Sequence, residues 1–198
     1  MDENELEDLE RELPGLARLS RFARSLDRIP WFANIGEALT PGAKAAADDY
    51  CSGLGFPDAE VAMLLDWDDA ASAAESLDWQ SPAWEAEESL RADLTGRALE
   101  MLSEDALRIG MALIAEKVSG PAKDAIEELS YLSDLDDSAI ETLGVGAAVQ
   151  AANGAALALI AAANADFDAE NHPFAAKFRL FEFGRWPVSI TGSSFNLF

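Results

Sequence analysis

"LGVGAAVQAANGAALALIAAA", residues 143–163, is the main evidence for the fold of this 198-residue chain. It carries no charged residue and is about long enough to cross a bilayer. However, its apolar residues are mostly Ala and Gly, and it contains Gln150 and Asn153, whose amide groups would be costly in hydrocarbon. We therefore interpret it as a buried helix and expect no membrane span.

A capping pattern indicates where this helix begins. Ser138 and Glu141 fit the S-x-x-E capping box, which predicts a helix over residues 139–163. Small side chains along most of its faces would let other helices approach closely from several sides. The stretch therefore predicts an all-α fold, in which seven to nine helices pack around a central Ala/Gly-rich helix.

Other helix boundaries are predicted from capping residues and prolines. The pairs Thr40-Pro41 and Ser81-Pro82 are typical of helix starts. A further helix is predicted to begin at Pro57. Its residues expected to be buried are Val61, Leu64 and Leu65. Because proline cannot donate a hydrogen bond to the preceding turn, Pro121 predicts a break between two helices.

The N-terminal residues 1–30 are predicted to form a helical arm packed on the body, and residues 31–198 a single helical domain. The first part of the arm is strongly acidic, whereas the second part carries a row of arginines. These are Arg18, Arg21, Arg24 and Arg28. The row is interpreted either as a basic face that docks on the acidic body or as a partner-binding face.

The C-terminal region combines a helical and an alternating pattern. Phe174, Phe178 and Phe181 recur at helical spacing after a cap at Asn171 or His172. An alternating apolar pattern then predicts a short β-hairpin over about 187–198. Its candidate partner-binding residues are Trp186, Val188, Ile190, Phe195 and Leu197. An isolated hairpin is marginal in water, so it must cover its own body, bind a partner or pair with a second copy of the chain.

Net charge restricts the classes of partner. With 37 acidic and 14 basic residues, the chain has a formal net charge of −23. Such a charge repels nucleic acids and anionic lipid surfaces and attracts basic proteins and cationic ligands, although it can also serve solubility alone. The single cysteine, Cys51, excludes an internal disulfide, and seven acids among the first twelve residues are unlike a signal peptide. We expect a cytoplasmic, bacterial protein that binds neither nucleic acid nor membrane.

Catalytic patterns are scarce in the sequence. His172 is the single histidine, and neither a G-x-S-x-G elbow nor a phosphate-binding loop is present. Cys51 and His172 could form a nucleophilic pair, but nothing in the sequence places them together. We therefore expect no enzymatic activity and no cofactor.

Two groups of residues are candidates for a ligand site. The loop with alternating Asp166, Asp168, Glu170 and His172 offers possible metal ligands, the alternative being a solvated loop with a helix cap. Asp66, Asp68 and Asp69 resemble the start of a calcium loop, but Ala71 stands where that loop requires glycine, so we interpret them as a helix cap. The tryptophans near many acids are Trp67, Trp79 and Trp84, which could line a pocket for a cation or belong to the core.

These observations favour a protein-interaction module that binds a basic partner as an inhibitor, an immunity-type factor or an adaptor. The alternative is a small-molecule or metal-binding protein with a pocket of tryptophans and carboxylates. No motif in the sequence indicates a family.

Overall fold

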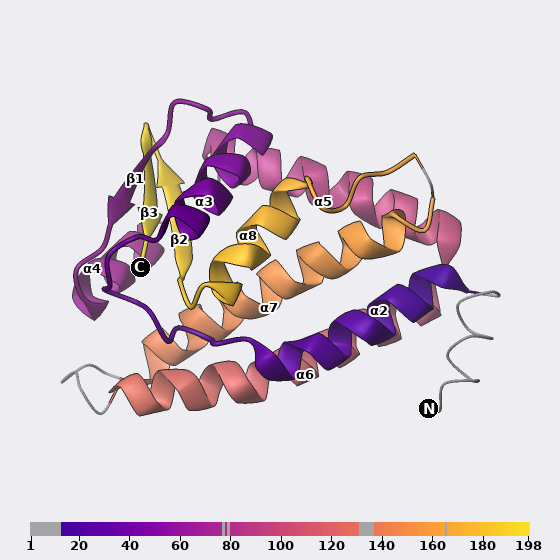
Figure 1. Cartoon of the computed structure of the whole chain (residues 1–198), viewed down its shortest axis with the longest axis horizontal. Helices are drawn as coiled ribbons and strands as arrows, with labels where there is room; N and C mark the ends of the chain where they lie inside the picture. The colour runs from indigo at the N-terminus through magenta and orange to yellow at the C-terminus, as the bar shows by residue number, and fades with distance from the viewer. Residues whose placement is uncertain (1–12, 77, 79, 131–136, 165) are drawn as a thin grey trace.

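The computed structural model describes residues 13–76, 78, 80–130, 137–164 and 166–198, and it is mostly helical with a small sheet (Figure 1). Within these residues the helices are α2 (Pro14–Ser25), η1, a 3₁₀-helix (Leu26–Arg28), α3 (Pro41–Gly53), α4 (Trp67–Glu75), α5 (Pro82–Met101), α6 (Glu104–Ser130), α7 (Asp137–Ala161) and α8 (Pro173–Glu182). The strands are β1 (Glu60–Met63), β2 (Pro187–Thr191) and β3 (Ser194–Leu197). The predicted all-α bundle with a C-terminal hairpin is confirmed.

Helix α7 is the centre of the bundle, as predicted. It contacts α2, α4, α5, α6 and α8, and its fully buried residues include Ala148, Ala152, Ala156 and Ala158. Gly154 shows why small residues are needed, because a Cβ added there would lie 2.9 Å from ring atoms of Phe174 on α8. Close approach of the neighbouring helices therefore depends on the small side chains of α7.

The segment Glu141–Ala161 of α7 is long and apolar enough to cross a membrane, judged by length and composition, among the residues that the structure describes. In the structure, 56% of its most apolar window is buried inside the protein. The core helix of a globular protein meets the same criterion, so the expectation that no segment spans a membrane stays a prediction.

Helix α6 continues through Pro121, so the predicted break there is wrong. Pro121 is exposed, while Val118, Ala122 and Ile126 are buried in the core. A proline inside a helix removes one backbone hydrogen bond and costs about 3 kcal/mol. Burial of the apolar residues on both sides of Pro121, in the long contact between α6 and α7, outweighs this cost.

The sheet has the order β1-β3-β2, with β3 in the centre. Strands β2 and β3 form the predicted hairpin, whereas β1 pairs in parallel with β3, placing Val61 opposite Phe195 and Met63 opposite Leu197. The face carrying these side chains packs on α3, where the rings of Tyr50 and Phe195 are 5.3 Å apart. The helix predicted from Pro57 is therefore wrong over β1, and Leu65, predicted to be buried, is 81% exposed.

Helix α2 and η1 pack on α6 and α7. Leu19, Ala23 and Leu26 are buried in this contact, while Arg24 and Arg28 are exposed. The described part of the predicted arm therefore meets the body through apolar residues. Residues 1–12 lie outside the described residues.

The end of α8 is joined to the segment between η1 and α3. Arg185 is 1% exposed and donates hydrogen bonds to the backbone oxygens of Glu37 (2.9 Å) and Ala38 (2.7 Å). Asn34 donates its backbone N–H to Gly184 O (3.0 Å) and its Nδ2 to Phe183 O (2.9 Å). Gly184 has a φ of 70°, as expected for a residue that ends a helix.

Candidate functional site

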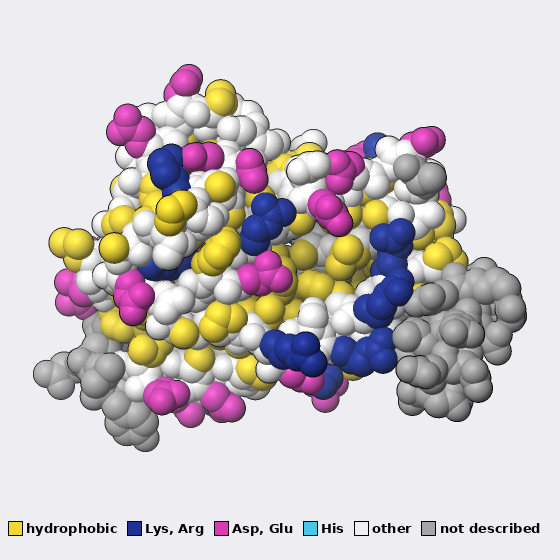
Figure 2. Space-filling view, in the orientation of Figure 1, with side chains coloured by type: hydrophobic (Ala, Val, Ile, Leu, Met, Phe, Trp, Pro, Cys, Tyr) yellow, Lys and Arg dark blue, Asp and Glu magenta, His cyan; other side chains and the backbone are white. Residues whose placement is uncertain are grey.

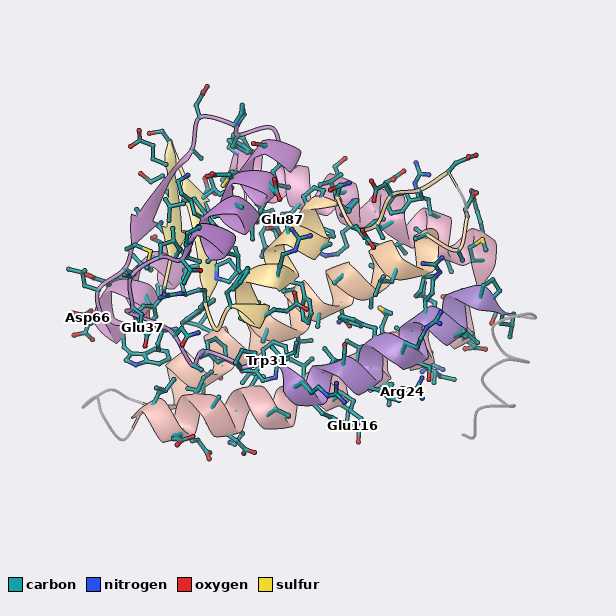
Figure 3. All side chains as sticks on the ribbon, viewed as in Figure 1. Arg24, Trp31, Glu37, Asp66, Glu87 and Glu116 are labelled. Carbon is teal, nitrogen blue, oxygen red and sulfur yellow. The ribbon has the colours of Figure 1, made fainter. Side chains whose placement is uncertain are left out.

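An acidic surface surrounds the sheet. Between residues 58 and 88 the sequence contains no Lys or Arg. The exposed carboxylates of β1, α4 and their connections, here called the acidic sheet end, are Asp58, Glu60, Asp66, Asp68, Asp69, Glu75 and Asp78. Among the described residues none of these seven forms an ion pair. Figure 2 shows acidic side chains at the left edge of the molecule, and Figure 3 shows Asp66 at its outer surface.

Part of this acidic surface is explained by the start of α4. Asp66 caps the helix by accepting the backbone N–H of Asp69 (2.9 Å), as predicted from the sequence. Asp68 and Asp69 lie in the first turn, where a negative charge interacts favourably with the helix dipole. Glu60 on β1 and Asp58 before it have no such helical role.

Strand β1 forms one edge of the sheet. It is paired with β3 on one side, and no element lies beyond it on the other side in Figure 1. Unpaired strand edges expose backbone N–H and C=O groups, and proteins usually cover or charge them. The carboxylates of the acidic sheet end therefore surround an open strand edge.

A second candidate site is a buried polar cluster formed by Tyr50 of α3, Glu87 of α5 and Lys177 of α8. Lys177 Nζ donates to Glu87 Oε1 (2.6 Å), and Tyr50 Oη donates to the same oxygen. The exposed fractions of the Lys177 and Glu87 side chains are 13% and 8%. Arg91 contacts the other oxygen of Glu87 at 3.5 Å. Figure 3 shows Glu87 between the helices that this cluster joins.

The surroundings change the pKa values in this cluster. Burial raises the pKa of Tyr50 well above its usual value, and the neighbouring Glu87 carboxylate raises it further. Burial is the largest single influence on Glu87 and tends to raise its pKa, but the charge and hydrogen bond of Lys177, the hydrogen bond of Tyr50 and the charge of Arg91 together outweigh burial, so the pKa is lowered. At neutral pH Glu87 is therefore ionised and Tyr50 is neutral.

This cluster forms part of the wall of a pocket of about 180 Å³, here called the cluster pocket. The other lining residues include Ser81, Trp84, Gly146, Gln150, Val188 and Ile190. A wider groove of about 600 Å³ between α5 and α7 shares Trp84 and Gln150 with it. Asn153 lines this groove, and its Oδ1 is buried without a hydrogen-bond partner within the described chain. The two cavities together combine an apolar wall with several polar groups.

The predicted metal loop uses its polar groups for local structure. Asp168 accepts hydrogen bonds from the backbone N–H groups of Glu170 and Asn171 and from Asn171 Nδ2. These bonds lower the pKa of Asp168, the side-chain bond of Asn171 most strongly. His172 Nδ1 accepts the backbone N–H of Phe174 (3.1 Å) and caps α8. Asp166 is exposed. In the part of the chain that is described, no three His, Cys, Asp or Glu side chains are placed together to hold a metal ion.

The predicted partner-binding residues of the hairpin lie within the fold. Trp186, Ile190, Phe195 and Leu197 are buried, with exposed fractions of 9% or less, and Val188 is half-buried. The hairpin therefore packs on its own body, and Val188 and Ile190 line the cluster pocket. Partner binding by these five residues stays a prediction.

The candidate tryptophans Trp67 and Trp84 have different surroundings in the described part of the chain. Trp67 is buried against Trp186 and Phe198, Trp84 is half-buried at the cluster pocket, and Trp79 lies outside the described residues. Burial raises the pKa of the Cys51 thiol to about 11, so it stays protonated near neutral pH and is a poor nucleophile.

One feature of the sequence does indicate this cluster. Along α5, the buried positions Ala83, Glu87, Leu94 and Ala98 follow helical spacing, so Glu87 stands as an acid within an apolar stripe. Its partners Tyr50 and Lys177 are 37 and 90 residues away in sequence, and no local pattern connects them.

Comparison with protein-family models, curated proteins and solved structures reveals no match to this chain.

Proposed function

We propose that this chain is a protein-interaction module that binds a basic partner through the acidic sheet end, as an inhibitor, an immunity-type factor or an adaptor. The observation that carries the proposal is the group of seven exposed carboxylates without cationic partners among the described residues. A negatively charged surface attracts a positively charged protein as the two approach, and it repels proteins whose surface is also negative.

The strength of exposed ion pairs and their screening by salt limit how much the acidic sheet end can contribute to the binding free energy. An exposed ion pair contributes about 0.2–1 kcal/mol, so a few rim contacts alone give weak binding. Screening by salt limits these interactions to about 8 Å at physiological ionic strength. We therefore expect binding that weakens as salt rises, and that requires several carboxylates at once.

The test begins with the tagged protein in its native host, purified at low and at moderate salt, and continues with the purified partner. The variant Asp58→Asn/Glu60→Gln/Asp68→Asn removes three charges from the acidic sheet end. The control Glu100→Gln/Glu104→Gln/Glu116→Gln removes three exposed charges from α5 and α6. We expect the first variant to bind the partner at least about tenfold more weakly and the control to bind nearly as well as the parent. Equal loss in both variants would show that net charge alone is responsible and would overturn the proposed surface.

A second candidate function is small-molecule binding in the cluster pocket. It is favoured by the position of Lys177 at the wall of a cavity that also presents Trp84 and Val188. A small amphipathic ligand fits this arrangement, with a hydrogen-bond acceptor toward Lys177 and an apolar part against the other two residues.

Thermal-shift titration with aryl carboxylates and size-matched aryl amides tests this second function. We expect the melting temperature of the parent to rise with compound concentration. Val188→Trp should fill the cavity and abolish the rise, whereas Leu65→Trp, at an exposed site outside the cavity, should not. A parent protein that responds to neither class of compound would exclude this function.

A further inference from the structure

We infer that the basic partner binds by strand addition, as an extended segment that pairs with the open edge of β1. This inference rests on the proposed function and specifies how the acidic sheet end engages its partner. Addition of a strand to a sheet edge is a common mode of peptide recognition, in which backbone hydrogen bonds supply affinity and side chains supply specificity.

The pairing of β1 with β3 determines which backbone groups face outward. Glu60 N donates to Ser193 O (2.8 Å), and Leu64 N donates to Leu197 O (2.9 Å). In a parallel pair, alternate residues direct both their N–H and C=O groups to the same neighbouring strand. Ala62 therefore also faces β3, and Val61 and Met63 direct their backbone groups to the open edge.

The side chains beside this edge specify the residues of an added strand. Val61 and Met63 lie on the apolar face that packs on α3, and Glu60 and Ala62 lie on the opposite face. An added strand would continue both faces, because side chains alternate across a sheet. The structure therefore favours a segment in which Lys or Arg, beside Glu60, alternates with β-branched residues beside Val61 and Met63.

The same charges argue against a second copy of this chain as the occupant. Two β1 edges in register would bring Asp58, Glu60 and Asp66 of both copies close together, and like charges on neighbouring strands are destabilising. A basic strand has the opposite effect, because its cations meet carboxylates that have no cationic partner among the described residues. The edge is thus selective for a partner of opposite charge.

The experiment uses a synthetic peptide of alternating Lys and Val as the probe, with the full chain. Amide hydrogen exchange and NMR chemical shifts report which backbone groups the peptide covers. We expect protection of the Val61 and Met63 amides. A second peptide, N-methylated at alternate positions, keeps the charge but cannot donate from those positions, and we expect it to bind about tenfold more weakly or worse.

Two variants separate strand addition from charge attraction. Met63→Pro removes one outward N–H and leaves the pairing with β3 intact, since proline is tolerated at strand edges where the N–H faces solvent. We expect this variant to melt cooperatively and to lose at least about tenfold in peptide affinity. Glu60→Gln should weaken binding and reduce its salt dependence while the Val61 and Met63 amides remain protected.

The outcomes distinguish the two proposals. If both peptides bind equally and Met63→Pro has no effect, while charge removal still weakens binding, strand addition is overturned and the proposed function stands. If neither peptide binds at low salt and no basic partner is found, both proposals are overturned. A dimer by light scattering with protected β1 amides in the absence of peptide would show that a second copy occupies the edge, contrary to the inference.

Discussion

At the scale of single residues, Glu87 is a carboxylate inside the core whose charge depends on its partners. Removal of one member of a buried ion pair leaves an uncompensated charge, which is costly in a medium of low polarity. Lys177 makes the shortest ion pair to Glu87, and it contacts the Tyr50 ring with Nζ 5.4 Å from the ring centre. The three residues join α3, α5 and α8, so loss of one of them should weaken the packing of all three helices.

We predict that Lys177→Met lowers the free energy of unfolding by about 3 kcal/mol, because Glu87 keeps its buried charge without its main cation. Urea denaturation measures this value. The double variant Lys177→Met/Glu87→Gln should recover part of the loss, since the buried charge is then removed.

Lys44→Met is the matched control. Lys44 pairs with Asp48 at 2.6 Å, but the exposed fractions of their side chains are 60% and 51%. An exposed pair of this kind contributes about 0.2–1 kcal/mol. Equal effects of Lys44→Met and Lys177→Met would contradict the importance assigned to the buried cluster.

His172 gives the protein a pH dependence of known sign. Burial is the main cause that lowers its pKa, and its neutral Nδ1 caps α8. In the unfolded chain a histidine titrates near pH 6.5. As pH falls below that value, the unfolded state takes up a proton before the folded state does, so this contribution to stability is lost.

We predict that the parent loses stability relative to His172→Asn between about pH 7.5 and about pH 5.5, because asparagine caps a helix without titrating in this range. The measurement is urea denaturation of both proteins at the two pH values. A constant difference between them would contradict the assignment. Calcium, manganese or zinc added to both proteins should produce no stabilisation specific to the parent if His172 acts solely as a cap.

At the scale of elements, the small residues of α7 differ in what they do. Gly154 lies against Phe174 of α8, whereas a Cβ added at Gly146 would meet nothing within 4 Å. The same substitution at two glycines of one helix therefore separates packing from helix propensity.

We predict that Gly154→Ala lowers the free energy of unfolding by about 1–3 kcal/mol, because the added methyl would lie 2.9 Å from two ring atoms and 3.2 Å from the Cβ of Phe174. Gly146→Ala should raise it by about 0.5–1 kcal/mol through better helix propensity. Thermal and urea denaturation of both variants provide the test. A stabilising Gly154→Ala would mean that α7 and α8 are less tightly packed than the structure indicates.

Elements with local signals were predictable from the sequence, and elements that depend on distant residues were not. Thr40, Ser81 and His172 each cap the helix that their sequence pattern indicated. Strand β1 was missed because its partner β3 lies more than a hundred residues later in the chain, and a four-residue strand carries little periodicity. The break predicted at Pro121 was wrong for a related reason, since burial of α6 against α7 outweighs the local preference of proline to end a helix.

At the scale of the whole molecule, charge is distributed unevenly. Carboxylates surround the sheet, while the basic residues of α2 form a row on the face shown in Figure 2. With a net charge of −23, repulsion between carboxylates destabilises the compact state at low ionic strength.

We predict that the melting temperature rises between about 10 mM and about 300 mM NaCl, because salt shortens the range of this repulsion. Calorimetry measures it directly. The variant Asp58→Asn/Glu60→Gln/Asp68→Asn should show a smaller rise than the parent. A melting temperature that falls with salt would indicate that attraction between opposite charges, rather than repulsion, dominates the surface.

Several contacts join an early part of the chain to its last residues, so the complete fold can form only at the end of synthesis. Asn34 and Phe183 are 149 positions apart in the sequence, and Arg185 and Glu37 are 148 positions apart. The parallel partner of β1 likewise comes from the last strand. A ribosome adds about 5–20 residues per second. Many seconds therefore pass between the synthesis of β1 and the segment before α3 and the synthesis of the residues with which they pair. During that interval an edge strand and several aromatic side chains remain uncovered, and the nascent chain should depend on chaperones more than its helical content alone implies.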